Sequence, residues 1–140
     1  MEKRNILFVM SSLRNGGAER SLVNLLQLLD YDRYNVDLLL FQNEGMFLKQ
    51  VPKEVNIISN CNKLYTLYDN NKTEALKHPY LSVVHMIGTF ISRKKTNSVA
   101  KSRQYRWEHF YKKIIPELTK EYDVAIAYMQ REQTYFLVDK

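Results

Sequence analysis

The residues of this chain that are best suited to chemistry lie in one short loop near the N-terminus. The stretch Ser11–Arg20 reads Ser-Ser-Leu-Arg-Asn-Gly-Gly-Ala-Glu-Arg and contains the adjacent glycines Gly16 and Gly17. Glycine lets the backbone approach a ligand without an intervening side chain. A helix that starts beside these glycines adds N–H groups and the positive end of its dipole. The loop is therefore a candidate site for a phosphate group.

Two better-known phosphate motifs are absent from this loop. No lysine followed by serine or threonine comes after the glycines, so the loop is not the P-loop of nucleotide hydrolases. The dinucleotide fingerprint G-x-G-x-x-G is missing as well. An alternative interpretation is that Gly16 and Gly17 only turn the chain tightly, and their spacing alone does not separate the two possibilities.

The residues on either side predict the elements that position this loop. The unbroken apolar run Ile6–Met10 is typical of a short strand buried on both faces. From Ala18 onward the apolar residues recur at helical intervals, at Leu22, Leu25, Leu26 and Leu29. A buried strand, a glycine turn and an amphipathic helix form the first two-thirds of a βαβ unit.

The following residues continue the alternation of strand and turn. We expect strands at Val36–Phe41 and Val55–Ile58, separated by a turn at Gly45 and one helical turn within Met46–Val51. This order predicts an α/β fold with a Rossmann-like, doubly wound parallel sheet in the strand order 3-2-1-4. Ligands of such sheets sit beyond the carboxyl ends of the strands. Those ends are Ser11–Ser12, Gln42–Asn43 and Ser59–Asn60.

A long excursion, residues 60–121, separates the third strand from the fourth. Within it we expect capping residues at Asn70–Glu74, a helix that starts at Pro79, and another helix capped by Ser98 and kinked at Pro116. The fourth strand is expected at Tyr122–Tyr128, and a last helix starts at Thr134–Val138. The chain of 140 residues has no internal repeat or interdomain linker, so it predicts a single domain.

Composition excludes several classes of site. The single cysteine, Cys61, rules out an intramolecular disulfide and a cysteine-based metal site. The histidines His78, His85 and His109 lack the spacing of metal ligands, and His85 is expected to pack in the core. Asp123, at a strand boundary, is interpreted as structural. The apolar run after the basic start is too short for a signal sequence or a membrane span, which predicts a cytoplasmic protein.

Positive charge gathers in the excursion. Between Arg93 and Lys113 lie eight basic residues against Glu108 alone, which exceeds the net charge of +6 for the whole chain. One interpretation is a solvated helical face. The other combines this charge with the apolar residues before it, so that residues 81–113 contact an anionic membrane or an acidic acceptor. No motif for binding nucleic acid accompanies the charge.

The N-terminal stretch resembles the signature of the retaining family 4 glycosyltransferases of the GT-B fold. The resemblance rests on Ile6–Val9, on Gly16–Arg20 with the leucine-rich segment after it, and on the segments Tyr34–Leu40, Val51–Ile57 and Tyr122–Tyr128. It implies two Rossmann-like domains that face each other across a cleft. It also implies transfer of a sugar, with retention, from a UDP- or GDP-sugar to a glycan or lipid-linked acceptor. The family usually needs no metal, and no further cofactor is implied.

The same resemblance implies roles for individual residues. Gly16 and Gly17 would place backbone N–H groups near the donor diphosphate and its sugar, where charge grows on the leaving phosphate. Glu19 and Arg20 match the letters of the signature, although Glu19 can equally serve the helix dipole. The candidate residues for the acceptor or the cleft are Ser12, Arg14, Asn15, Glu19, Arg20, Tyr128 and Gln130. No catalytic residue is assigned within this chain.

The chain departs from the family in its length. A two-domain enzyme has roughly twice as many residues or more. We therefore expect residues 1–140 to be the N-terminal, acceptor-side domain, inactive without the donor domain. An alternative from another class is a non-catalytic, flavodoxin-like module that binds a phosphorylated small ligand, since it would share the strand, glycine and helix at the start. A second βαβ series with the family's donor motif after Lys140 would favour the transferase.

Overall fold

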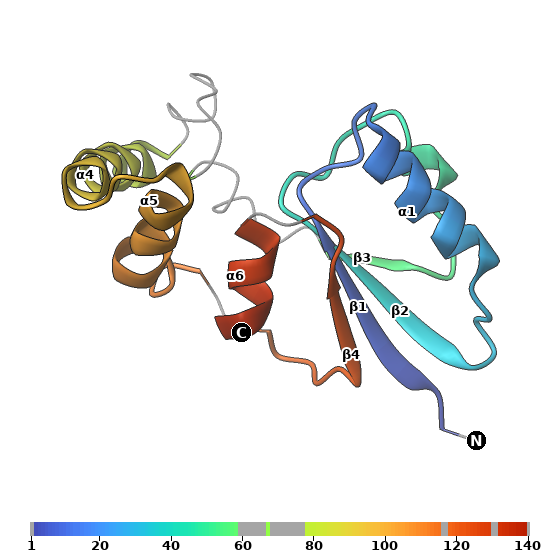
Figure 1. Cartoon of the computed structure of the whole chain (residues 1–140). Helices are drawn as coiled ribbons and strands as arrows, with labels where there is room; N and C mark the ends of the chain where they lie inside the picture. The colour runs from blue at the N-terminus through green and yellow to red at the C-terminus, as the bar shows by residue number, and fades with distance from the viewer. Residues whose placement is uncertain (1, 59–66, 68–77, 116–117, 130–131, 140) are drawn as a thin grey trace.

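The computed structural model describes residues 2–58, 67, 78–115, 118–129 and 132–139. Its centre is a four-stranded sheet in the order β3-β2-β1-β4, in which all the paired strands are parallel. The strands are β1 (Arg4–Met10), β2 (Tyr34–Leu40), β3 (Asn56–Ile58) and β4 (Val124–Ala127). Figure 1 shows this sheet with helices on both sides. The predicted fold class and strand order are therefore confirmed.

The register aligns the two central strands over their whole length. Arg4 of β1 pairs with Tyr34 of β2, and Met10 pairs with Leu40. Both strands begin two residues before the predicted apolar runs, because polar residues at their starts also join the sheet. β4 is shorter than predicted and starts at Val124, where it pairs with Ile6.

Each central strand is buried on both faces. On one face, Ile6, Phe8 and Met10 pack with the helix α1 (Gly17–Leu28) through Leu22 and Leu26. On the other face, Leu7 and Val9 of β1 join a separate core cluster. Its further buried members are Leu39, Phe41, Leu67, Leu81, Trp107, Tyr111, Ile115 and Phe136. The continuous apolar runs of these strands are explained by this burial on both sides.

The predicted excursion forms a group of helices on the face of the sheet opposite α1 (Figure 1). It contains α4 (Pro79–Lys95), α5 (Val99–Arg106) and a π-helical turn, η2 (Trp107–Tyr111). Pro79 starts α4 as predicted, at a position that needs no N–H donor. The residue before α5 is Ser98, but its side chain makes no capping hydrogen bond. The predicted features at Asn70–Glu74 and Pro116 lie outside the described residues.

The last helix, α6 (Glu132–Asp139), connects these helices to the sheet. Asp139 accepts a hydrogen bond from the indole Nε1 of Trp107, and its other carboxylate oxygen lies 2.5 Å from Lys112 Nζ. Phe136 is fully buried beside Phe41, with their ring centroids 6.0 Å apart. The aromatic ring and the carboxylate therefore hold α6 between the sheet and η2.

A short connection, which contains the 3-10 turn η1 (Leu48–Gln50), leads from β2 to β3. It is hydrogen-bonded to the loop after β1. Leu13 donates its N–H to the carbonyl of Glu44 at 2.9 Å and accepts the N–H of Phe47 at 3.2 Å. Gly45 has a φ of 131°, and a Cβ placed there would lie 1.9 Å from the carbonyl oxygen of Leu13. The contact between the two loops therefore requires glycine at position 45.

We predict that Gly45→Ala destabilises the protein by about 1–3 kcal/mol, because the added Cβ meets the backbone of Leu13 in a conformation that side chains rarely adopt. The matched control is Gly17→Ala in the first turn of α1, where a Cβ meets no described atom within 4 Å. That control should keep the stability or raise it by up to about 1 kcal/mol. Urea unfolding of both variants measures the difference, and equal midpoints would contradict the prediction.

Candidate functional site

The glycine loop lies at the carboxyl end of β1, as the sequence predicts. Gly16 immediately precedes α1, and Gly17 is the first residue of the helix. Position 17 has no left-handed φ, and a Cβ placed on it would project into open space. Neither the backbone conformation nor the described packing therefore demands glycine there. This glycine leaves room in front of the first helical turn, where backbone N–H groups have no helical acceptor.

Glu19 occupies part of the space in front of the helix. It is the third residue of α1, and its carboxylate turns back toward Gly16, so that a Cβ on Gly16 would lie 2.1 Å from Glu19 Oε2. A negative charge in the first turn is favourable for the helix dipole. The structure is thus consistent with the alternative role of Glu19 as a helix-dipole partner. An incoming phosphate at Gly16 would have to displace this flexible side chain.

Arg14 is held across the edge of the sheet by the loop after β2. Its Nε lies 2.6 Å from Glu44 Oε1, and its Nη2 donates to Gln42 Oε1 at 3.1 Å. About half of the Arg14 side chain is exposed, so this ion pair adds little to stability. Its effect is instead to orient the guanidinium beside the glycine loop. Glu44 was not identified from the sequence, because its pairing with Arg14 depends on how the two loops are fastened.

Tyr128 also reaches the helix that follows the glycine loop. Its hydroxyl lies 2.8 Å from Ser21 Oγ of α1, and its backbone N–H donates to the carbonyl of Val9 at 3.1 Å. These bonds bring the end of β4 to the same end of the sheet as the loop. Of the other predicted residues, Ser12 is buried at the loop, whereas Asn15 and Arg20 are exposed. Gln130 lies outside the described residues.

The loop has groups that suit the binding of an anion. The start of α1 provides N–H groups, Gly17 leaves them accessible, and Arg14 adds a positive charge nearby. The carboxylates of Glu19 and Glu44 neutralise part of this field. Such an arrangement can hold a phosphate and stabilise charge that develops on it.

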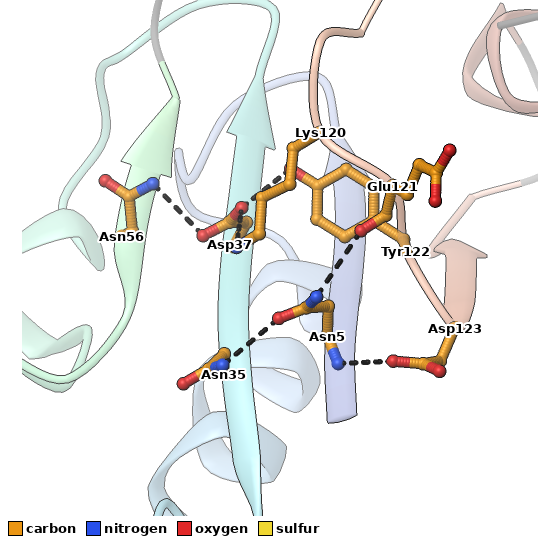
Figure 2. Close-up of polar contacts among 8 residues, drawn as sticks. All are labelled: Asn5, Asn35, Asp37, Asn56, Lys120, Glu121, Tyr122 and Asp123. Atoms are coloured by element: carbon orange, nitrogen blue, oxygen red, sulfur yellow. Dashed lines mark hydrogen bonds and ion pairs between the residues drawn. The ribbon is translucent and has the colours of Figure 1, made fainter. Parts of the chain in front are cut away.

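A second polar cluster, which the sequence analysis missed, lies on the central strand β2 (Figure 2). Asp37 is almost fully buried, and its carboxylate accepts three hydrogen bonds, one from β3 and two from the segment before β4. The donors are Tyr122 Oη at 2.6 Å, Lys120 Nζ at 2.9 Å and Asn56 Nδ2 at 3.0 Å. A single carboxylate within an apolar strand was the available signal, since a buried charge needs partners.

The partners determine the ionisation of Asp37. Burial by itself raises the pKa of this carboxyl group, but the hydrogen bonds from Tyr122, Lys120 and Asn56, together with the Lys120 charge, outweigh burial and lower the pKa. Burial and the same hydrogen bond raise the pKa of Tyr122. Asp37 is therefore ionised in the folded protein near neutral pH and is fully paired.

This cluster has a structural role. Asp37 is the middle residue of β2, Asn56 is the first residue of β3, and Lys120 and Tyr122 precede β4, whereas ligands of parallel sheets sit beyond the carboxyl ends. Figure 2 shows further bonds beside it, in which Asp123 Oδ2 accepts the N–H of Asn5 at 2.7 Å and Asn35 donates to Asn5 Oδ1 at 3.1 Å. These bonds fasten the segment before β4 to β1 and β2. They are consistent with the interpretation of Asp123 as structural.

His85, expected in the core, is half-buried on α4. Its Nδ1 lies 3.1 Å from the hydroxyl of Tyr111 and also contacts the carbonyl of Leu67. Burial lowers the pKa of His85, the bond to Leu67 raises it, and the charge of Arg106 lowers it further. The net direction is downward, which favours a neutral imidazole that packs between α4 and η2.

Two further kinds of site are not found among the described residues. No group of three or more histidine, cysteine, aspartate or glutamate residues in those ranges could hold a metal ion. None of the described helices is long and apolar enough to cross a membrane.

Comparison with known protein families, curated proteins and solved structures finds no match for this chain. The class of protein is therefore defined by the fold alone. It is an α/β protein with a Rossmann-like parallel sheet.

We predict that Asp37 makes stability depend on pH in the acid range. Its pKa is lower in the folded state, so its contribution is present above the unfolded value of about 4 and is lost as the pH falls through the folded value. Asp37→Asn should be about 1–3 kcal/mol less stable than the wild type at pH 7, and the difference should shrink below about pH 4. Unfolding by urea at several pH values measures both.

Asp32→Asn is the control for this series, since Asp32 is an exposed carboxylate in the turn before β2. Its unfolding profile should follow that of the wild type. A difference between Asp37→Asn and the wild type that stays constant from pH 7 to pH 3 would contradict the assigned role of the Asp37 charge.

Proposed function

We propose that this chain is the N-terminal, acceptor-side domain of a retaining glycosyltransferase of the GT-B fold, similar to family 4. The full enzyme would move a sugar from a UDP- or GDP-sugar to a glycan or a lipid-linked acceptor. The single observation that carries the proposal is Gly17 at the start of α1, where a Cβ would enter open space at the carboxyl edge of a Rossmann-like sheet.

The contrast between two glycines supports this interpretation. Gly45 is required by its φ of 131° and by its approach to Leu13. Gly17 has neither requirement, although glycine at the start of a helix costs backbone entropy. A ligand that closely approaches the first turn would explain why the position lacks a side chain. A phosphate is the ligand that such a turn suits best.

The proposed chemistry uses the loop as an electrostatic element. When the bond between the sugar and the diphosphate breaks, negative charge grows on the leaving phosphate. N–H groups at Gly16 and Gly17 would stabilise that charge, and Arg14, oriented by Glu44 and Gln42, would add to the effect.

The remaining candidate residues would contact the acceptor or line the cleft. Ser12, Asn15, Arg20 and Tyr128, together with Gln130, retain this proposed role. The nucleotide and most of the sugar would be held by a second domain. This domain alone would therefore not catalyse transfer.

We also propose that α4 contacts an anionic membrane surface, within the segment 81–113. Val83, Met86, Ile87 and Phe90 of this segment are exposed, and the exposed fractions of Met86 and Phe90 are 70% and 63%. Tyr80, immediately before the segment, is exposed as well. The last turn of the same helix carries Arg93, Lys94 and Lys95. An apolar helical face next to a group of positive charges suits the interface of an anionic bilayer.

The proposed donor site is tested by Gly17→Val in the two-domain enzyme. The branched side chain would occupy the space needed by the phosphate, and we expect turnover to fall by about 100-fold or more, as for the loss of oxyanion donors. Asn24→Val is the control for placing a β-branched side chain in this helix, because Asn24 is an exposed residue further along α1. A transfer assay with UDP- and GDP-sugars provides the measurement.

Unfolding midpoints of both variants establish that the fold is retained. If a well-folded Gly17→Val variant is as active as the Asn24→Val control, Gly17 has only a structural role in the turn. That result would contradict the proposal. Tight binding of a phosphorylated ligand without any transfer, in a protein that lacks a donor domain, would favour the flavodoxin-like module instead.

The membrane contact is tested by sedimentation with vesicles of phosphatidylglycerol and phosphatidylcholine. The double substitution Met86→Ser and Phe90→Ser should weaken binding at least about tenfold, because burying each large apolar side chain contributes about 1.5–3 kcal/mol when complete. Leu28→Ser is the control, as Leu28 is an exposed apolar residue of α1. Equal binding by the double variant and by this control would contradict the proposal.

A further inference from the structure

A cleft with a volume of about 470 Å³ lies between α4 and α5, in the helical group opposite α1. Its lining includes Arg93, Arg103 and Arg106 as well as the polar side chains of Thr89 and Ser102. Such a volume falls within the range of about 300–1,000 Å³ that is common for sites of small ligands. The cleft is separate from the glycine loop, because α1 lies on one side of the sheet and the α4–α5 pair lies on the other side, beyond α6 (Figure 1).

The arginine side chains of the cleft are the charged groups of interest. Its lining contains three guanidinium groups and no aspartate or glutamate among the described residues. Glu108, which is nearby in the sequence, accepts a hydrogen bond from Gln104 Nε2 at 2.8 Å instead. A guanidinium group presents several N–H donors in a fixed planar arrangement that matches the oxygens of a phosphate.

Arg106 has hydrogen-bonding capacity that the described residues do not use. Its Nε is buried and has no hydrogen-bond partner in the described part of the chain. Its Nη1 is 3.4 Å from Thr89 Oγ1, which is a long contact. Because a buried donor without an acceptor is unfavourable, the guanidinium would gain from an oxygen-rich ligand.

A helix start adds donors to the arginines. The hydroxyl groups of Ser92 and Ser102 do not, because Ser92 donates to the carbonyl of Thr89 at 3.1 Å and Ser102 donates to Ser92 Oγ at 2.8 Å. Ser98 and Val99 also line the cleft, at the beginning of α5, where no side chain caps the helix. Guanidinium groups combined with the N–H donors of a helix start match the several oxygens of a phosphate better than a single carbonyl or hydroxyl group.

We propose that the cleft between α4 and α5 binds a phosphate-bearing ligand through Arg93, Arg103 and Arg106. The site is independent of the proposed glycosyl transfer, since it uses none of the residues of the glycine loop. The phosphate can come from a free phosphorylated molecule or from a phospholipid headgroup. The second source is close at hand, because α4 also carries the exposed apolar face with Met86 and Phe90.

The test compares two double variants that remove the same charge from the same segment. Arg93→Gln with Arg103→Gln removes two guanidinium groups from the cleft, whereas Lys101→Gln with Lys113→Gln removes two exposed charges outside its lining. The probe is inorganic phosphate at constant ionic strength, so that general screening is the same in every sample. Binding is followed by the shifts of backbone amide NMR signals.

For the wild type and the lysine variant, we expect phosphate to shift amide signals of residues 89–106 with similar affinity. For the arginine variant, the affinity should fall at least about tenfold, as for lost charge-assisted hydrogen bonds. Equal affinity in the two double variants, or no shifts in the wild type, would overturn the proposal. If the arginine double variant does not fold, Arg93→Gln alone is compared with Lys101→Gln, with the same expectation in direction.

A second arm identifies the source of the phosphate. Vesicles of phosphatidylglycerol and phosphatidylcholine are compared with vesicles of phosphatidylcholine alone. A phospholipid source predicts that the arginine variant loses binding to the anionic vesicles more than the lysine variant does. If the two double variants lose binding to the anionic vesicles equally and the phosphate result above holds, the ligand of the cleft is a free phosphorylated molecule.

Discussion

The register between β1 and β2 is the constraint on which the rest of this structure depends. Because Met10 and Leu40 are paired, the two strands end at the same level and their loops leave the sheet together. Backbone bonds from Phe41 to Met10 and from Gln42 to Ser11 continue the alignment past the sheet. The contact of Gly45 with Leu13 then closes the two loops against each other. The orientation of Arg14 and the path of the chain into α1 both follow from this contact.

Polar side chains are buried in the middle of the sheet but partly exposed at the carboxyl ends of its strands. Midway along β2, the Asp37 carboxylate is buried and receives hydrogen bonds from β3 and from the segment before β4. A charge in such a place is tolerated only because every partner is present, and the cluster is therefore rigid and closed. At the carboxyl ends, Arg14 and Glu19 are partly exposed around Gly17, where the packing leaves space. The Asp37 cluster holds the strands together, whereas the surroundings of Gly17 leave space that a ligand could enter.

The helices opposite α1 have properties that the packing of the sheet does not explain. Leu81, Trp107 and Tyr111 bury one side of this group against β1, β2 and α6. The remaining side of α4 exposes large apolar residues, and the cleft beside it concentrates arginine side chains. A large exposed apolar area is unusual for an isolated folded chain, and this observation is the reason for the binding roles proposed for this helix pair.

The sequence by itself determined the parallel sheet, its strand order and the position of the glycine loop. Apolar runs such as Ile6–Met10 and the helical spacing after Ala18 are local patterns, and burial on both faces follows directly from them. Only the tertiary structure decided which polar groups meet. Asp37 and Tyr122 are 85 residues apart, Arg14 and Glu44 are 30 apart, and Ser21 and Tyr128 are 107 apart. The basic run after Arg93 was visible in the sequence, but the convergence of three arginines on one cleft required the pairing of α4 with α5. Periodicity reports which face of an element is buried, whereas a hydrogen bond depends on the relative placement of two elements, which no local pattern contains.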